Sequence, residues 1–113
     1  MIVMIVVRIT LNVRAEKQME LLQTLLSLIE PVKKEKGCKS YAIFCDIKDK
    51  NSFCIMEEWT TQKDLNRHLK SLRFGVLLGT KPLLQKPPIV RIHTKAGVQG
   101  MAAVEEARAQ GGE

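Results

Sequence analysis

Residues 38–59, CKSYAIFCDIKDKNSFCIMEEW, contain two runs rich in apolar and aromatic residues on either side of the polar stretch KDKN at 48–51. Two such runs joined by a short turn are typical of a β-hairpin. If the four-residue turn sets the register, Cys45 lies opposite Cys54. A shift of one residue would change these pairs, but either register leaves apolar side chains on both faces. We therefore expect both faces of the hairpin to be covered.

The chain before the hairpin has the pattern of a strand followed by a helix. Residues 2–13 begin as a continuous apolar run and then alternate between apolar and polar side chains, which predicts a long strand. Residues 15–30, AEKQMELLQTLLSLIE, carry a broad apolar stripe at helical spacing. Pro31 is expected to end or kink this helix. A last turn then reaches Gly37, a residue type suited to a left-handed C-terminal cap.

The chain after the hairpin has the pattern of a second helix and a last strand. Thr61 begins the helix, with Asp64 three residues later in the position of a capping box. The expected buried stripe of the helix consists of three leucines: Leu65, Leu69 and Leu72. His68 lies at the border of this stripe. Residues 89–94, IVRIHT, predict the final strand.

The predicted element order is β-α-β-β-α-β, the ferredoxin-like arrangement of an α+β fold with an antiparallel four-stranded sheet. We expect one domain over residues 1–95 and a C-terminal tail over 96–113, either a short helix or disordered. Helices cover only one face of such a sheet, and an exposed apolar face usually marks an interface. Two sheets packed across a two-fold axis would cover it. The sequence therefore predicts a homodimer.

Composition limits the classes of partner. The 113 residues carry a net charge of +6, but the cations are scattered and the few aromatic residues offer little for bases to stack on, so we expect no nucleic-acid partner. The apolar N-terminal run lacks a basic leader region and is broken by Arg8, which predicts neither a signal peptide nor a membrane span. Three cysteines without CxxC or metal-finger spacing predict no metal site and a cytoplasmic location.

Several short motifs between residues 37 and 74 are similar to those of a known protein family. The motif residues fall in three groups: Gly37, Cys38 and Tyr41; Phe53, Glu57 and Trp59; and His68, Leu69 and Phe74. Together they resemble the antibiotic biosynthesis monooxygenase (ABM) superfamily, over about residues 5–94. The resemblance implies a dimeric α+β barrel, in which two four-stranded sheets join with their helices outside. This agrees with the apolar residues on both faces of the hairpin.

The resemblance also implies a chemistry. Some ABM members oxidise quinols or polyketide phenols with O2 and without flavin or metal, because the substrate itself ionises and gives an electron to oxygen. This implies a cofactor-independent monooxygenase acting on a small quinol, phenolic or polyketide-like substrate. Trp59 would shape the pocket and His68 would be the titratable catalytic group. The candidate substrate-binding residues are Arg8, Tyr41, Glu57 and Arg91. Glu57 would form a salt bridge to Arg8 or Arg91, or else act as a base.

Two departures from the family pattern keep other functions open. The polyketide-type members have polar residues at two positions that are Ile55 and Leu65 here. A non-catalytic, small-ligand-binding dimer of the same fold is therefore an alternative, in which Trp59 and His68 are ordinary core residues.

A second ABM branch degrades haem, and its site residues align here with Val7, His68 and Leu78, none of which matches. His68 alone could still ligate haem iron. The expectation is a protein without a cofactor, with haem binding as the disfavoured alternative.

Overall fold

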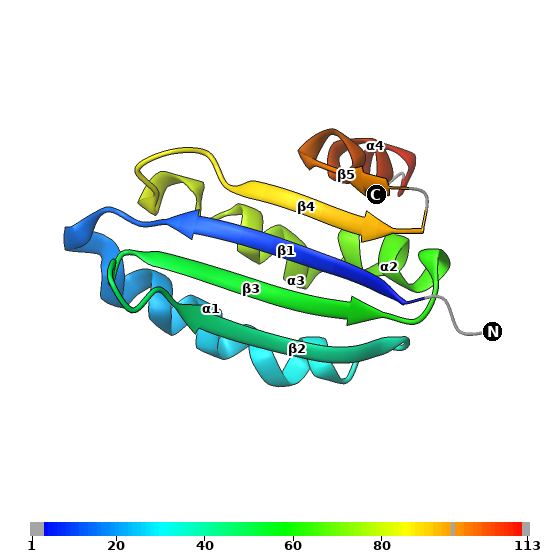
Figure 1. Ribbon diagram of the computed structural model, residues 1–113, viewed down its shortest axis with the longest axis horizontal. Coiled ribbons are helices and arrows are strands. Elements are labelled where there is room, and N and C mark those ends of the chain that lie inside the picture. Colours follow the sequence, from blue (N-terminus) through cyan, green and yellow to red (C-terminus); the bar gives the residue numbers. More distant parts are fainter. Residues whose placement is uncertain (1–3, 96, 112–113) are drawn as a thin grey trace.

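A computed structural model of the protein describes residues 4–95 and 97–111. It forms one antiparallel sheet with helices against one face (Figure 1). In chain order the elements are β1 (Ile5–Asn12), η1 (Ala15–Lys17), α1 (Gln18–Lys33), β2 (Cys38–Cys45), β3 (Ser52–Trp59), α2 (Gln62–Leu69), α3 (Leu72–Leu78), η2 (Lys81–Leu83), β4 (Ile89–Thr94), β5 (Gly97–Gln99) and α4 (Met101–Gly111), where η denotes a short 3-10 helix.

The order of the strands in the sheet is β2-β3-β1-β4-β5. The first four strands and the helices between them reproduce the predicted β-α-β-β-α-β order, so the ferredoxin-like fold is confirmed. The sheet differs from the prediction in having a fifth strand, because β5 pairs antiparallel with β4 at the edge.

The core lies between the sheet and the helices. Alternate residues of β1 point toward the helices and are almost fully buried, and α1 presents a stripe of four buried side chains to the same layer. These residues are Ile5, Val7, Ile9 and Leu11 of β1 and Leu21, Leu25, Leu28 and Val32 of α1. Burying each such side chain contributes about 1.5–3 kcal/mol. This packing fixes which face of each strand looks toward the helices.

The predicted pairing of Cys45 with Cys54 is wrong by one residue. Cys45 lies opposite Phe53 instead. The turn spans residues 46–51, rather than four residues, because the backbone N–H of Asp46 donates to the carbonyl of Ser52 at 2.9 Å. The Asp46 carboxylate also accepts two backbone N–H groups inside the turn, at 2.7 and 3.1 Å. Hydrogen bonds within the turn, which strand periodicity does not report, therefore set the register.

The one-residue change reassigns the faces of the hairpin. Tyr41 lies opposite Glu57, and both side chains, with that of Trp59, look toward the helices. The opposite face of the sheet, the open face, consists of alternate residues of four strands: Val6, Arg8, Thr10, Asn12, Ser40, Ala42, Phe44, Ser52, Cys54, Met56, Glu58, Ile89, Arg91 and His93.

The helices differ from the predicted ones at two places. Of the two alternatives, an end or a kink at Pro31, the end is wrong: α1 continues to Lys33, since a proline in the last turn removes only one intrahelical hydrogen bond. Leu72 is 84% exposed rather than buried. The chain turns after α2, and the Ser71 hydroxyl accepts the backbone N–H of Phe74 to begin α3 in a new direction.

The C-terminal segment packs on the rest of the chain through α4. Val104 is fully buried with the core, and Arg108 Nη1 donates to the carbonyl of Leu69 at 2.6 Å, at the C-terminal end of α2. Across residues 4–95 and 97–111, no helix has the length and apolar character needed to cross a membrane.

Candidate functional site

Trp59 and His68 meet beneath the sheet, where the end of β3 faces α2. The indole Nε1 of Trp59 donates to Glu57 Oε1 at 2.9 Å, and Nε2 of His68 lies 3.4 Å from Glu57 Oε2. The indole and imidazole rings are stacked, with centroids 4.5 Å apart and an interplanar angle of 28°. Exposure of the three residues is 0% for Glu57, 0% for Trp59 and 2% for His68. They form one closed, internal cluster.

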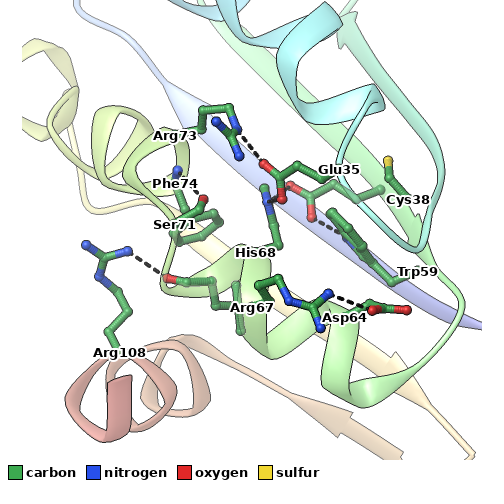
Figure 2. Close-up of polar contacts among 12 residues, drawn as sticks. Glu35, Cys38, Trp59, Asp64, Arg67, His68, Ser71, Arg73, Phe74 and Arg108 are labelled. Atoms are coloured by element: carbon green, nitrogen blue, oxygen red, sulfur yellow. Dashed lines mark hydrogen bonds and ion pairs between the residues drawn. The ribbon is translucent and has the colours of Figure 1, made fainter. Parts of the chain in front are cut away.

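The other nitrogen of His68 contacts a residue from a different part of the chain (Figure 2). His68 Nδ1 lies 2.9 Å from Oε1 of Glu35, in the segment between α1 and β2. The second oxygen of Glu35 accepts from Arg73 Nε at 2.6 Å. Phe74 places its ring edge-on to His68, with centroids 5.3 Å apart. Arg73 and Phe74 both come from the first turn of α3, so the Ser71 cap helps to position both.

Electrostatics favour the charged form of His68. Burial by itself lowers the pKa of the imidazole, but the hydrogen bonds to Glu35 and Glu57 and their negative charges outweigh burial and raise the pKa to about 9. Burial raises the pKa of Glu35, but hydrogen bonds from His68 and Arg73 lower it below its ordinary value. Near neutral pH the cluster therefore holds an imidazolium and a guanidinium against the Glu35 carboxylate on one side and Glu57 on the other.

Two acidic groups on β2 stay protonated beside this cluster. Burial raises the pKa of the Cys38 thiol to about 11, with a further increase from the charges of Glu57 and Glu35. Burial and the charge of Glu57 also raise the pKa of the Tyr41 hydroxyl. Near neutral pH, Cys38 is therefore a thiol rather than a nucleophilic thiolate, and Tyr41 is a neutral phenol that can donate a hydrogen bond.

The structure divides the six candidate residues into two groups. Glu57, Trp59 and His68 are in contact, and Tyr41 lies opposite Glu57 on the same side of the sheet. Arg8 and Arg91 lie opposite each other on β1 and β4, exposed on the open face.

The predicted salt bridge from Glu57 to Arg8 or Arg91 is wrong. Glu57 lies opposite Val7 across the β1–β3 pair, so the side chain of Arg8 points to the other face of the sheet. The partners of Glu57 are Trp59 and His68.

Glu35 and Arg73 were not among the residues singled out from the sequence. Glu35 lies 33 positions before His68 and reaches it because the chain turns sharply at Gly37, where φ is +86°. The Gly37 carbonyl accepts the backbone N–H of Thr60 at 2.9 Å, which ties this turn to the end of β3. The only sequence signal was an acidic residue two positions before a capping glycine, and such a pattern identifies no partner.

The buried cluster does not suit haem ligation as it stands. Both ring nitrogens of His68 contact carboxylates, so neither is free for iron. In the described part of the chain, no group of three or more His, Cys, Asp or Glu side chains is arranged to hold a metal ion.

Two pockets on the described surface lie away from the cluster. A pocket of about 500 Å³ lies between the segment before β4 and the start of α4, lined by Lys81, Leu84, Gln85, Lys86, Pro87, Pro88, Met101 and Glu105. Another of about 260 Å³ lies at the turn end of the open face and includes Arg8. Since Glu57, Trp59 and His68 are at most 2% exposed, a substrate reaches them only if the segments that cover them move.

Comparisons with known proteins identify the family. The sequence profile of the family described as "Antibiotic biosynthesis monooxygenase" matches residues 4–77. An uncharacterised protein of Synechocystis sp. is 32% identical over 96 residues, which cover 84% of this chain and 65% of that protein. The chain thus spans less than two thirds of that relative's length.

Two further similarities agree with the family match. The Bacillus subtilis protein named "Putative monooxygenase YcnE" is 29% identical over 85 residues, covering 74% of this chain and 90% of that protein. The crystal structure of a conserved protein from Methanosarcina mazei superposes with a TM-score of 0.75 at 27% identity, covering 80% of this chain and 90% of the other. The matched profile, the shared motifs and the shared fold lead to one conclusion: the chain belongs to the antibiotic biosynthesis monooxygenase family.

Proposed function

We propose that the protein is a cofactor-independent monooxygenase that oxidises a small quinol or phenolic substrate with O2. The observation that carries the proposal is the buried array of Glu35, His68 and Glu57 against the indole of Trp59. A carboxylate held beside an aromatic wall and away from water is suited to taking a proton from an aromatic hydroxyl. Loss of that proton makes the substrate a better electron donor to oxygen.

The reaction balances without an external reductant. A quinol loses a proton from its hydroxyl, transfers an electron to O2, and forms a carbon–oxygen bond to the resulting superoxide. Loss of water from the peroxide leaves a hydroxyquinone, so that quinol and O2 give hydroxyquinone and H2O. In an anthrone-like phenol, the same sequence converts a ring CH2 to C=O and again releases one water. The substrate supplies all four electrons.

Each buried residue has a proposed role. Trp59 forms the wall on which the substrate ring packs, and Glu57 accepts the hydrogen bond and then the proton of the substrate hydroxyl. His68 balances the charge of Glu57 and hydrogen bonds to it. The Tyr41 hydroxyl, kept neutral by burial and the nearby negative charge, donates to a substrate oxygen. Arg8 and Arg91 lie on the other face, so we assign them to the dimer interface instead.

The proposal includes assembly and location. A homodimer formed through the open face would cover its apolar residues and produce the dimeric α+β barrel. The three cysteines, Cys38, Cys45 and Cys54, are free thiols, which supports a location in the reducing cytoplasm.

One observation favours a second function, a small-ligand-binding dimer without catalysis. The donor groups of Trp59 and His68 already bond to Glu57 and Glu35, so the cluster is satisfied without any ligand. Such a network can exist to stabilise the fold alone.

Oxygen uptake tests the proposed activity. Metal-free protein is mixed with a panel of reduced quinones and anthrone-like phenols, and O2 consumption is compared with the autoxidation blank. The expected result is uptake with one O2 consumed per substrate, lowered about 10²–10⁴-fold by Glu57→Gln, as for loss of a general base. Trp59→Ala is expected to weaken it as well, whereas Glu30→Gln, an exposed change on α1, serves as the matched control. Absence of uptake across the panel, or wild-type rates in folded Glu57→Gln, would contradict the enzyme and favour the binding protein.

A further inference from the structure

Glu35 makes the shorter of the two carboxylate contacts to His68. Its Oε1 lies 2.9 Å from Nδ1, whereas Glu57 Oε2 lies 3.4 Å from Nε2, a longer and therefore weaker hydrogen bond. The two carboxylates approach opposite sides of one imidazole. With a proton on each nitrogen the ring can donate to both, but with a single proton it can donate to only one. The protonation of His68 therefore couples Glu35 to Glu57, although these two residues are not bonded to each other.

The surroundings of Glu35 make it a rigid partner for His68. Its side chain is only 10% exposed, and its second oxygen is held by Arg73 Nε at 2.6 Å. Figure 2 shows Glu35 between Arg73 and His68, so that the guanidinium, the carboxylate and the imidazole form a row leading inward from α3. Arg73 is 42% exposed at the outer end of this row.

We propose that Glu35 is a positioning residue of the site, which holds a proton on each ring nitrogen of His68 so that the Nε2–H is directed at Glu57. This inference rests on the proposed function for the role of Glu57, but the link from Glu35 to His68 stands on the geometry alone. Without Glu35, the second proton of His68 loses its closest acceptor, and burial then favours the neutral imidazole. A neutral His68 has only one N–H, so it donates to Glu57 only in the tautomer that leaves Nδ1 without a proton.

The titratable and charged groups around His68 come from every element packed against it. They are Glu57 on β3, Glu35 in the α1–β2 segment, Arg73 on α3, Cys38 and Tyr41 on β2, and Asp64 and Arg67 on α2 itself. Asp64 and Arg67 form their own ion pair at 2.8 Å. Cys38 and Tyr41 are protonated up to high pH. Glu35 and Glu57 are therefore the negative charges that act on His68 near neutral pH.

NMR titration of the histidine ring signals tests this inference without any substrate. The chain has two histidines, so His93 provides an internal reference for His68. In Glu35→Gln the pKa of His68 is expected to fall by about one to three, the usual effect of an opposite charge at this distance. Glu35→Asp should restore part of the effect, and Glu30→Gln, on the exposed side of α1, should change nothing. Arg73→Gln keeps Glu35 and removes a positive charge, so it should not lower the pKa of His68.

The pH profile of oxygen uptake gives the second readout. In Glu35→Gln the alkaline limb of kcat/KM is expected to move to lower pH, since His68 then loses its second proton, and with it one of its two N–H groups, at a lower pH. An unchanged pKa of His68 in folded Glu35→Gln would overturn the inference, and so would an unshifted alkaline limb. If the wild-type protein oxidises no substrate, the proposed function fails, while the NMR titration still decides whether Glu35 controls His68.

Discussion

At the scale of single residues, the burial of Glu57 needs an explanation. A fully buried carboxylate without partners is unfavourable by several kcal/mol, because the protein interior solvates a charge much less well than water does. Glu57 receives an N–H from Trp59, two positions along the same strand, and faces the imidazolium of His68. The stacked indole also contacts that cation, an arrangement that adds favourable interaction energy. These contacts explain why Glu57, Trp59 and His68 belong together whether or not the site is catalytic.

The raised pKa of His68 makes a prediction about stability. A pKa of about 9 in the folded protein against 6.5 in the unfolded chain means that the folded state binds the proton more tightly. The associated stability is fully present below pH 6.5 and is lost as pH rises through 9. The difference corresponds to about 3 kcal/mol in the free energy of unfolding. Urea denaturation at a series of pH values is the measurement.

The pH window isolates His68 from the other shifted groups. Glu35, whose pKa is lowered, changes the free energy of unfolding with pH only below pH 4.5. Cys38, whose pKa rises from 9 to about 11, changes it only above pH 9. His68→Gln should therefore remove the decline between pH 6.5 and 9 while leaving the rest of the profile in place. A wild-type profile that is flat over this window would contradict a charged His68.

At the scale of secondary-structure elements, Gly37 joins three segments. It lies between α1 and β2 with φ at +86°, and a Cβ built there would lie 2.2 Å from the Asp64 carboxylate near the start of α2. Its carbonyl accepts the N–H of Thr60 after β3. The turn thus sets the approach of α1, α2 and the hairpin, and through it the distance from Glu35 to His68.

Gly37→Ala is expected to destabilise the protein. A left-handed conformation costs an L-residue about 1–2 kcal/mol relative to glycine, and the contact with Asp64 adds to this. The decrease in the free energy of unfolding should be measured with urea, together with the His68 pKa, which should fall if Glu35 is displaced. In an Asp64→Gly background, which removes the Asp64 Cβ at 2.4 Å as well as the carboxylate, the cost of Gly37→Ala should be smaller, since mainly the backbone strain remains. Equal costs in the two backgrounds would show that the side chain of Asp64 is not the obstacle.

Elements were predictable from the sequence where the signal was local. Apolar periodicity identified β1, α1, both hairpin strands, α2 and β4, and Thr61 accepts the N–H of Asp64 at 3.0 Å as the capping pattern predicts. Features that depend on distant or specific hydrogen bonds were not predictable. The register of the hairpin depends on the six-residue turn organised by Asp46. The exposure of Leu72 depends on the helix cap at Ser71, and the contact of Glu35 with His68 depends on the turn at Gly37.

The candidate site shows the same limit. The motif residues Glu57, Trp59 and His68 were identified through the family resemblance, and they lie close together in the sequence at the end of a strand and on the next helix. Arg8 and Arg91 were chosen as cations near Glu57, but successive side chains of a strand point to opposite faces, and the observed register places both arginines on the other face. A one-residue error in register is enough to exchange the two faces, so charge alone could not assign partners.

At the scale of the whole molecule, the open face lacks a cover in a single chain. Phe44 is 55% exposed and Ile89 is 40% exposed, and both belong to this face. Arg8 and Arg91 lie directly opposite each other there, and like charges in that relation are destabilising. A second copy packed against this face would bury the apolar residues and could bring acidic groups such as Glu58 toward the arginines. The open face therefore supports the proposed homodimer.

Sedimentation equilibrium tests this interface. The wild-type protein is expected to sediment with twice the monomer mass of 12.8 kDa. Met56 lies beside Arg8 and Ala42 at the centre of the open face, so Met56→Lys would bury a third positive charge in a row with Arg8 and Arg91. The dimer should weaken by about 100-fold or more, since like charges across an interface cost several kcal/mol. Leu72→Lys, on the exposed helical side, is the control and should leave the dimer intact. A wild-type monomer at all concentrations, or a Met56→Lys dimer of full strength, would place the interface elsewhere or exclude it.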